Sequence, residues 1–147
     1  MNSAGAAALA ILAVTACAPV LKADPPSADR PSVTAVEIAP RTVLSGCPFQ
    51  ISIAFEDPHA DVVTARARWT HEDGSRVHDS GLIGLPIDRA ALTGRRAGTA
   101  VAALTVQHPG RYWYSVQVED AAGRRSNVRD AWVVVHRQPA SEVRSCG

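Results

Sequence analysis

The feature that most restricts the fold of this chain is an alternation of apolar and polar residues with a period of two. Three runs show it most clearly. Their apolar members are Phe49, Ile51, Ile53 and Phe55 in the first run, Val63, Ala65, Ala67 and Trp69 in the second, and Tyr112, Tyr114, Val116 and Val118 in the third. Successive side chains of a strand point to opposite faces of a sheet, so each run predicts a strand with one buried face.

Three more segments have the composition of strands, namely residues 33–39, 99–107 and 129–136. Turn-forming pairs separate the candidate strands: Asp57-Pro58, Asp73-Gly74, Pro109-Gly110 and Ala122-Gly123. No segment carries the apolar stripe of an amphipathic helix. About seven short strands in a chain of 147 residues predict an all-β fold, an antiparallel Greek-key sandwich of the immunoglobulin type.

Three motifs resemble those of PKD-type immunoglobulin-like domains. Gly110-x-Tyr112-x-Tyr114-x-Val116-x-Val118-x-Asp120-x-x-Gly123 is similar to their strand F and the turn after it. Trp69-x-x-x-Asp73-Gly74 resembles their tryptophan and hairpin, and Asp57-Pro58-His59-Ala60-Asp61 resembles their acidic loop after strand B. The resemblance covers residues 31 to 136 and departs at Glu72, where the family has glycine. It implies an extracytoplasmic binding or spacer module, commonly an accessory to adhesins and secreted hydrolases.

The aromatic residues of these motifs have expected structural roles. Tyr112 fits a tyrosine corner, in which the hydroxyl bonds to a nearby backbone group. Trp69 is expected in the core, on strand C. Trp113 alternates to the face opposite Tyr112 and Tyr114, so the pattern predicts that it is exposed, covers the sheet edge or meets Trp132 on the neighbouring strand.

The N-terminal segment predicts export. Residues 4–16 are apolar and uncharged and have the length of a signal peptide. Val14-Thr15-Ala16-Cys17 resembles the lipobox of bacterial lipoproteins, in which the cysteine is lipidated and becomes the mature N-terminus. The alternative is an ordinary signal peptide with a free cysteine near the cleavage site. Residues 1–16 also lack the basic residues that usually begin such segments.

The chain is therefore predicted to comprise a signal peptide at 1–16, a lipidated Cys17 with a Pro-rich tether over 17–31, and the sandwich with a C-terminal tail at 32–147. Family lipoproteins carry two or three acyl chains, which anchor a protein stably to a membrane without spanning it. The expected location is the outer membrane facing the periplasm in a Gram-negative cell, and otherwise the outer face of the cell membrane.

The other two cysteines are expected to pair. With Cys17 lipidated, Cys47 and Cys146 remain as an even number in an oxidising compartment. The strand that follows Cys47 begins at the pole where the last strand ends, so the C-terminal tail can fold back to it. Closing so long a loop would contribute roughly 4–5 kcal/mol in the chain-entropy model. This is not the bridge between strands B and F of antibody domains, because Tyr114 occupies the position on strand F.

An acidic cluster is the first candidate site. In this topology the loop after strand B and the loop after strand F share one pole, which predicts that four carboxylates converge there: Asp57, Asp61, Glu119 and Asp120. Hard oxygen ligands of this kind suit Ca²⁺. The alternative is a solvated, mutually repelling group of loop residues.

Two further candidates lie between residues 71 and 87. A two-residue hairpin at Asp73-Gly74 would bring His71 and His78 diagonally onto one face, where they could share a metal or sense pH, although Arg76 lies beside them. The apolar segment after it is either an exposed partner-binding loop or an edge strand blunted by Pro86. Its apolar members are Leu82, Ile83, Leu85 and Ile87, with Trp113 as a further partner-binding candidate.

The expected function is non-catalytic. The sequence holds no nucleophile elbow, zinc-protease motif, Cys-x-x-Cys or phosphate-binding glycine loop, and no cofactor is expected. The net charge of +1 argues against general nucleic-acid binding. The leading interpretation is a lipid-anchored envelope protein that binds or positions another envelope component, either protein or glycan. The alternatives are a glycan- or calcium-binding accessory to a hydrolase or transporter, and a structural spacer. The sequence leaves the oligomeric state open.

Overall fold

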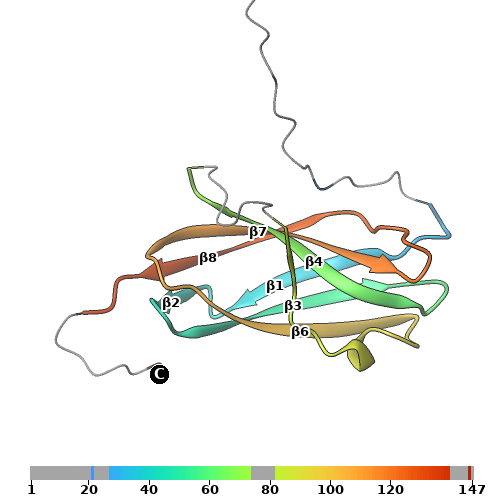
Figure 1. Ribbon diagram of the computed structural model, residues 1–147, viewed down its shortest axis with the longest axis horizontal. Helices are drawn as coiled ribbons and strands as arrows, with labels where there is room; N and C mark the ends of the chain where they lie inside the picture. Colours follow the sequence, from blue (N-terminus) through green and yellow to red (C-terminus); the bar gives the residue numbers. More distant parts are fainter. Residues whose placement is uncertain (1–20, 22–26, 74–81, 140–145, 147) are drawn as a thin grey trace, which may run out of the picture.

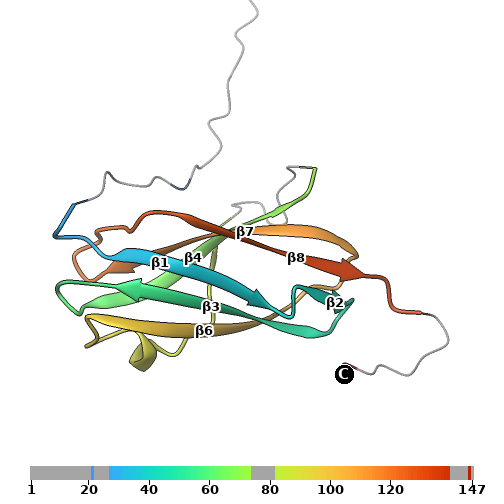
Figure 2. The ribbon, with the colours of Figure 1, turned by 180° about the vertical axis from the view of Figure 1, so that it is seen from behind.

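The structure, a computed structural model, is a sandwich of two β-sheets (Figures 1 and 2). It describes residues 21, 27–73, 82–139 and 146. The strands are β1 (Ser32–Ala39), β2 (Thr42–Leu44), β3 (Pro48–Glu56), β4 (Val62–His71), β5 (Leu82–Gly84), β6 (Ala97–Thr105), β7 (Gly110–Asp120) and β8 (Arg129–His136). One sheet has the order β1-β3-β6 and the other the order β2-β8-β7-β4-β5. The predicted all-β immunoglobulin-like sandwich is therefore confirmed.

The apolar members of the alternating runs form most of the core between the sheets. The exception is Val63, because a register shift in β4 between Val62 and Thr64 buries Val62 in its place. On β3, the side chains of Phe49, Ile51, Ile53 and Phe55 are at most 1% exposed. On β7, the facing side chains of Val116 and Val118 are fully buried, and that of Tyr114 is nearly so. Each strand thus buries one face, as period-two alternation requires.

One pairing differs from the antiparallel prediction. The chain leaves β1 at the edge of one sheet and crosses through the cis peptide Ala39-Pro40 to β2 at the edge of the other. β2 then pairs with β8 in parallel, with Thr42 opposite Val134. The direction is parallel because β2 continues in the direction of β1 when it changes sheets. All the other pairings between these strands are antiparallel.

Aromatic residues hold the two sheets together at one end of the core. The Tyr112 hydroxyl donates a 2.8 Å hydrogen bond to the backbone oxygen of His108, so the predicted tyrosine corner is confirmed. Trp69 stacks on Tyr114 with ring centroids 5.8 Å apart, and Phe49 meets Tyr114 edge-on at 5.9 Å. The expected packing of Trp69 against the core is also confirmed.

A disulfide joins Cys47 to Cys146, with the two Cα atoms 5.4 Å apart. The predicted pairing is therefore confirmed. Cys47 precedes β3 and is 6% exposed, and it lies at the end of the sandwich where β2 and the last residues of β8 meet (Figure 1). We call this end the disulfide end. A stable disulfide is typical of exported proteins, because cytoplasmic thiols are kept reduced.

Candidate functional site

Three carboxylates meet at the opposite end of the sandwich, which we call the carboxylate end. Asp57 directly follows β3, Asp61 directly precedes β4, and Asp120 is the last residue of β7. Each offers an oxygen within 4.8 Å of those of the other two. Asp57 and Asp120 are at most 1% exposed. The predicted convergence of the two loops therefore occurs for these three residues.

Asp57 orders the loop between β3 and β4. Its carboxylate accepts hydrogen bonds from the backbone N–H of His59 at 3.2 Å and of Asp61 at 2.7 Å. Ala60 between them has a φ of 58°, in the left-handed region that usually favours glycine. Its carbonyl accepts a 2.7 Å bond from the backbone N–H of Gly94. The loop is thus built around a buried carboxylate.

Asp120 orders the loop after β7 in the same way. Its Oδ1 accepts hydrogen bonds from the backbone N–H of Ala122 at 3.0 Å and of Arg124 at 2.8 Å. Its Oδ2 accepts from Nε of Arg124 at 2.6 Å. The backbone N–H of Ala121 donates to the carbonyl of Asp61 at 3.0 Å, so the two loops are bonded to each other.

Asp61 differs from its two neighbours. Its Oδ1 is buried and has no hydrogen-bond partner among the described residues. Burial raises the pKa of this carboxyl group, and the charges of Asp57 and Asp120 and a hydrogen bond with Asp57 raise it further, against an opposing effect of Arg124. A bound cation would offset the repulsion among the three carboxylates and would give Oδ1 of Asp61 a partner. The three carboxylates are the residues that could hold Ca²⁺.

Glu119 lies outside this cluster, although the sequence analysis grouped it there. Its carboxylate is 3.3 Å from Nε of Arg125 and 3.9 Å from Nη1 of Arg66. Successive residues of a strand point to opposite faces, so Glu119 faces away from the sandwich when Asp120 faces into it. Proximity to Asp120 in the chain therefore does not bring Glu119 to the same face.

A second group lies on the outer face of the five-stranded sheet. Trp113 on β7 is directly opposite Trp132 on β8, and their ring centroids are 6.5 Å apart with the planes inclined at 54°. Trp113 is 38% exposed. The guanidinium carbons of Arg41 and Arg111 lie 5.5 and 5.4 Å from the Trp132 ring centroid. We call these four residues the Arg–Trp patch.

The sequence predicted only part of the Arg–Trp patch. Of the alternatives given for Trp113, the structure shows two together, because its side chain is exposed and also meets Trp132. Arg111 was within reach of the same reasoning, because it lies two residues before Trp113 and so shares its face. Arg41 gave no such signal, because it reaches Trp132 only through the crossover to β2.

The apolar segment after residue 81 forms an edge strand. β5 pairs with β4, with Ile83 opposite Ala67 and Leu82 opposite Arg68. Leu85 is buried, and Ile83 and Ile87 pack against the core. Of the two alternatives for this segment, the structure shows the edge strand, so these three side chains do not form an exposed apolar loop.

The histidine hypothesis cannot be followed to its second residue, because Arg76 and His78 lie outside the described residues. Nδ1 of His71 is 3.4 Å from the Asp73 carboxylate, and the His71 ring contacts Tyr112 edge-on at 5.2 Å. His71 therefore extends the aromatic packing at the end of β4.

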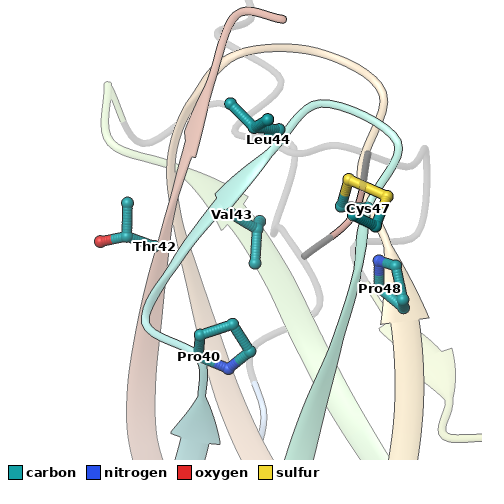
Figure 3. A pocket seen from close by; sticks show the side chains of 7 residues that line it. Pro40, Thr42, Val43, Leu44, Cys47 and Pro48 are labelled. Carbon is teal, nitrogen blue, oxygen red and sulfur yellow. A yellow bond between two sulfur atoms is a disulfide. The ribbon is translucent and has the colours of Figure 1, made fainter. Parts of the chain in front are cut away.

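A pocket of about 240 Å³ opens at the disulfide end. Figure 3 shows the side chains around it, which come from the crossover, the start of β3 and the disulfide. They are Pro40, Thr42, Val43, Leu44, Cys47, Pro48 and Cys146. Among these described lining residues there is no charged or titratable side chain.

Residues 1–20 lie outside the described part of the chain, and so do the predicted signal peptide, the lipobox at Cys17 and most of the tether. Among the residues that are described, none belongs to a helix with the length and apolarity needed to cross a bilayer.

The comparisons with known proteins report similarity in fold. No protein-family model matches the chain, and no curated protein matches it. The PKD domain of an M14-like peptidase from Thermoplasmatales archaeon SCGC AB-540-F20 is 16% identical, with 73% of this chain and 96% of that domain covered and a TM-score of 0.49. The cupredoxin domain of amoB from Nitrosocaldus yellowstonii is 10% identical, with 79% and 93% covered and a TM-score of 0.44.

A larger protein shares the architecture more closely by TM-score. The alkylpurine DNA glycosylase AlkC of Pseudomonas fluorescens is 14% identical, with 73% of this chain covered and a TM-score of 0.52. The match spans only 30% of that protein. At such identities the likeness concerns the fold alone, and the immunoglobulin-like assignment rests on the strand order and register described above.

Proposed function

We propose that this protein is a lipid-anchored, non-catalytic module of the bacterial cell envelope that binds or positions another envelope component. The observation that carries the proposal is the disulfide between Cys47 and Cys146. It is typical of an oxidising compartment, and it leaves Cys17, the third cysteine of the sequence, unbonded to either of them. Cys17 is also the cysteine that ends the lipobox-like Val14-Thr15-Ala16-Cys17.

Metabolic labelling tests the anchor. The full chain, expressed in a bacterial host fed an alkyne analogue of palmitate, is expected to take up the label and to partition with membranes. The Cys17→Ser variant is expected to lose both, whereas the paired cysteines stay protected from thiol reagents. Label that persists in Cys17→Ser, or wild-type protein without label in the aqueous fraction, would contradict the anchor.

In-cell crosslinking tests the binding role. Wild-type protein and Cys17→Ser are each crosslinked in the native host and purified, and the material that accompanies them is identified. A component that is recovered with the wild type and lost with the unanchored variant supports the module. If the wild type carries nothing beyond what an unrelated lipoprotein carries, the spacer alternative replaces it.

Calcium binding is a second candidate function, and the buried, unpartnered Oδ1 of Asp61 favours it. Calorimetric titration of the full chain with Ca²⁺ is expected to show binding that Asp61→Asn abolishes. Glu119→Gln is the matched control, because it removes one carboxylate of the same loop region outside the cluster. The absence of any heat at millimolar Ca²⁺, or an equal loss in both variants, would remove this candidate.

A further inference from the structure

The two arginines of the Arg–Trp patch carry positive charge that no acidic residue among those described neutralises. Arg41 and Arg111 are exposed, and neither guanidinium forms an ion pair or side-chain hydrogen bond with any residue that the structure describes. Both lie over or beside the Trp132 ring. A guanidinium held against an aromatic ring keeps its in-plane N–H donors free for a second partner. The patch therefore presents two oriented sets of donors to solvent.

Trp113 supplies an apolar surface next to these donors. It is one of two exposed large hydrophobic residues among those described, the other being Val101 on the opposite sheet. Its ring is tilted against Trp132 at 54° rather than packed flat on it, so part of one ring face remains available. Exposed tryptophan beside unpaired arginine is the composition of binding hot spots rather than of an ordinary solvated face.

The backbone beneath the patch limits what can bind there. β7 pairs with β4 on one side and with β8 on the other, and Trp113 has a partner residue on each of them, Thr70 and Trp132. No free strand edge is therefore offered at Trp113 for a peptide to join by backbone hydrogen bonds. Recognition at this face has to come from side chains, namely an aromatic ring and guanidinium groups.

We infer that the Arg–Trp patch binds an anionic saccharide. The C–H face of a sugar ring packs on the indole of Trp113, and a carboxylate or sulfate on the sugar accepts hydrogen bonds from Arg41 and Arg111. Trp132 is a positioning residue, because it holds the two guanidiniums in place. The inference deepens the proposed binding role and rests on it for the envelope setting, but the binding itself does not require the lipid anchor.

The position of the patch favours a saccharide over the membrane surface. Arg41 and the start of β7 belong to the disulfide end, whereas residues 27–31, through which the predicted tether enters, lie at the carboxylate end (Figure 1). The patch thus lies toward the end of the sandwich that is remote from the point of attachment.

The test measures binding by the full chain carrying Cys17→Ser, which lacks the lipid, with its disulfide intact. Oligogalacturonate provides carboxylates, heparin oligosaccharide provides sulfates as well, and cello-oligosaccharide provides neutral sugar. We expect binding to one or both anionic probes, weakened by salt as charge pairing requires, and at least tenfold weaker binding to the neutral probe. Vesicles with phosphatidylglycerol form the membrane arm.

The variants locate the site. Trp113→Ala and the double variant Arg41→Gln with Arg111→Gln are each expected to lower the affinity at least tenfold. Val101→Ala and Arg89→Gln are the matched controls, because they remove an exposed apolar residue and an exposed arginine elsewhere, and they should leave the affinity unchanged. Asp130→Asn, which removes a carboxylate from the same outer face, should strengthen binding.

Three outcomes would overturn the inference: no binding to either anionic probe at millimolar concentration, binding that survives the patch variants, or binding to the vesicles alone. Near-ultraviolet circular dichroism and the retained disulfide establish that each variant is folded. The proposed anchor is tested separately by palmitate labelling, so a failure of one proposal leaves the other measurable.

Discussion

The two ends of the sandwich are closed by different chemistry. At the disulfide end a covalent bond joins Cys47 to Cys146, and the neutral hydrogen bond of Tyr112 fixes the corner beside β7. At the carboxylate end the loops are held by charged hydrogen bonds to Asp57 and Asp120. The first kind of closure is covalent and neutral, whereas the second depends on the charge of buried carboxylates.

The largest effect that separates the two ends should come from the disulfide. Replacing both Cys47 and Cys146 with Ser is expected to lower the free energy of unfolding by about 4 kcal/mol, because the unfolded chain regains the entropy of a long loop. Urea denaturation measures the loss, which should be the same with calcium or with chelator. A loss below about 1 kcal/mol would show that the disulfide does not restrict the unfolded chain as the chain-entropy model assumes.

Removing a buried carboxylate should have the next largest effect. Asp120→Ala deletes the acceptor of two backbone N–H groups and of Nε of Arg124, and it is expected to cost about 2 kcal/mol. Denaturation in buffers of different ionic strength measures it. Unlike the loss of the disulfide, the cost should shrink as the ionic strength rises, because added salt weakens the ion pair between Asp120 and Arg124. A cost that is independent of ionic strength would mean that shape rather than charge holds the loop.

Asp61→Asn should change the free energy of unfolding less than Asp120→Ala does, and it should raise it. Because the pKa of Asp61 is raised in the folded protein, the folded state holds its proton more tightly than the unfolded state does. The wild type is therefore penalised above the folded pKa and gains stability as the pH falls through it. We expect Asp61→Asn to be the more stable protein at pH 7 without calcium, and the difference to disappear at low pH.

Thermal unfolding across a pH series measures this difference. Saturating Ca²⁺ should reverse the order of the two proteins if the cluster binds the ion, because only the wild type gains the added ligand energy. A variant that is less stable than the wild type at pH 7 in the presence of chelator would contradict the assigned repulsion.

The smallest effect is expected at Ala60. Its φ of 58° costs an alanine more than a glycine, and glycine loses part of that advantage through its greater freedom in the unfolded chain. Ala60→Gly should therefore raise the free energy of unfolding by about 0.5 kcal/mol. Denaturation with paired replicates resolves a change of this size. A destabilisation of the same size would show that the turn tolerates the alanine without strain.

Period-two alternation was enough to place the main strands, because burial of one face is a local property of a strand. The residues 129–136 expected as a strand are the residues of β8, and the expected 33–39 differs from β1 by one residue. The short strand β2 was not predicted, because three residues carry no readable period. Its parallel pairing depends on where the chain changes sheets, which no local pattern encodes.

The candidate sites divide in the same way. Sequence order and topology correctly brought Asp57, Asp61 and Asp120 to one end, because the loops that carry them must share a pole. They failed for Glu119, whose neighbour on β7 takes the inward position. The Arg–Trp patch was only partly visible, since Arg41 joins it across a change of sheet.

The sequence by itself determined the class of fold, most of the core-facing residues and the two cysteines that bond. It could do so because alternation and the parity of cysteines in an oxidising compartment need no knowledge of distant contacts. Only the tertiary structure decided that Asp61 has an unmet buried oxygen and that two arginines meet at Trp132. Both facts depend on which strands become neighbours and on which polar atoms then lack a hydrogen-bond partner. They are properties of the packed molecule and not of any one segment.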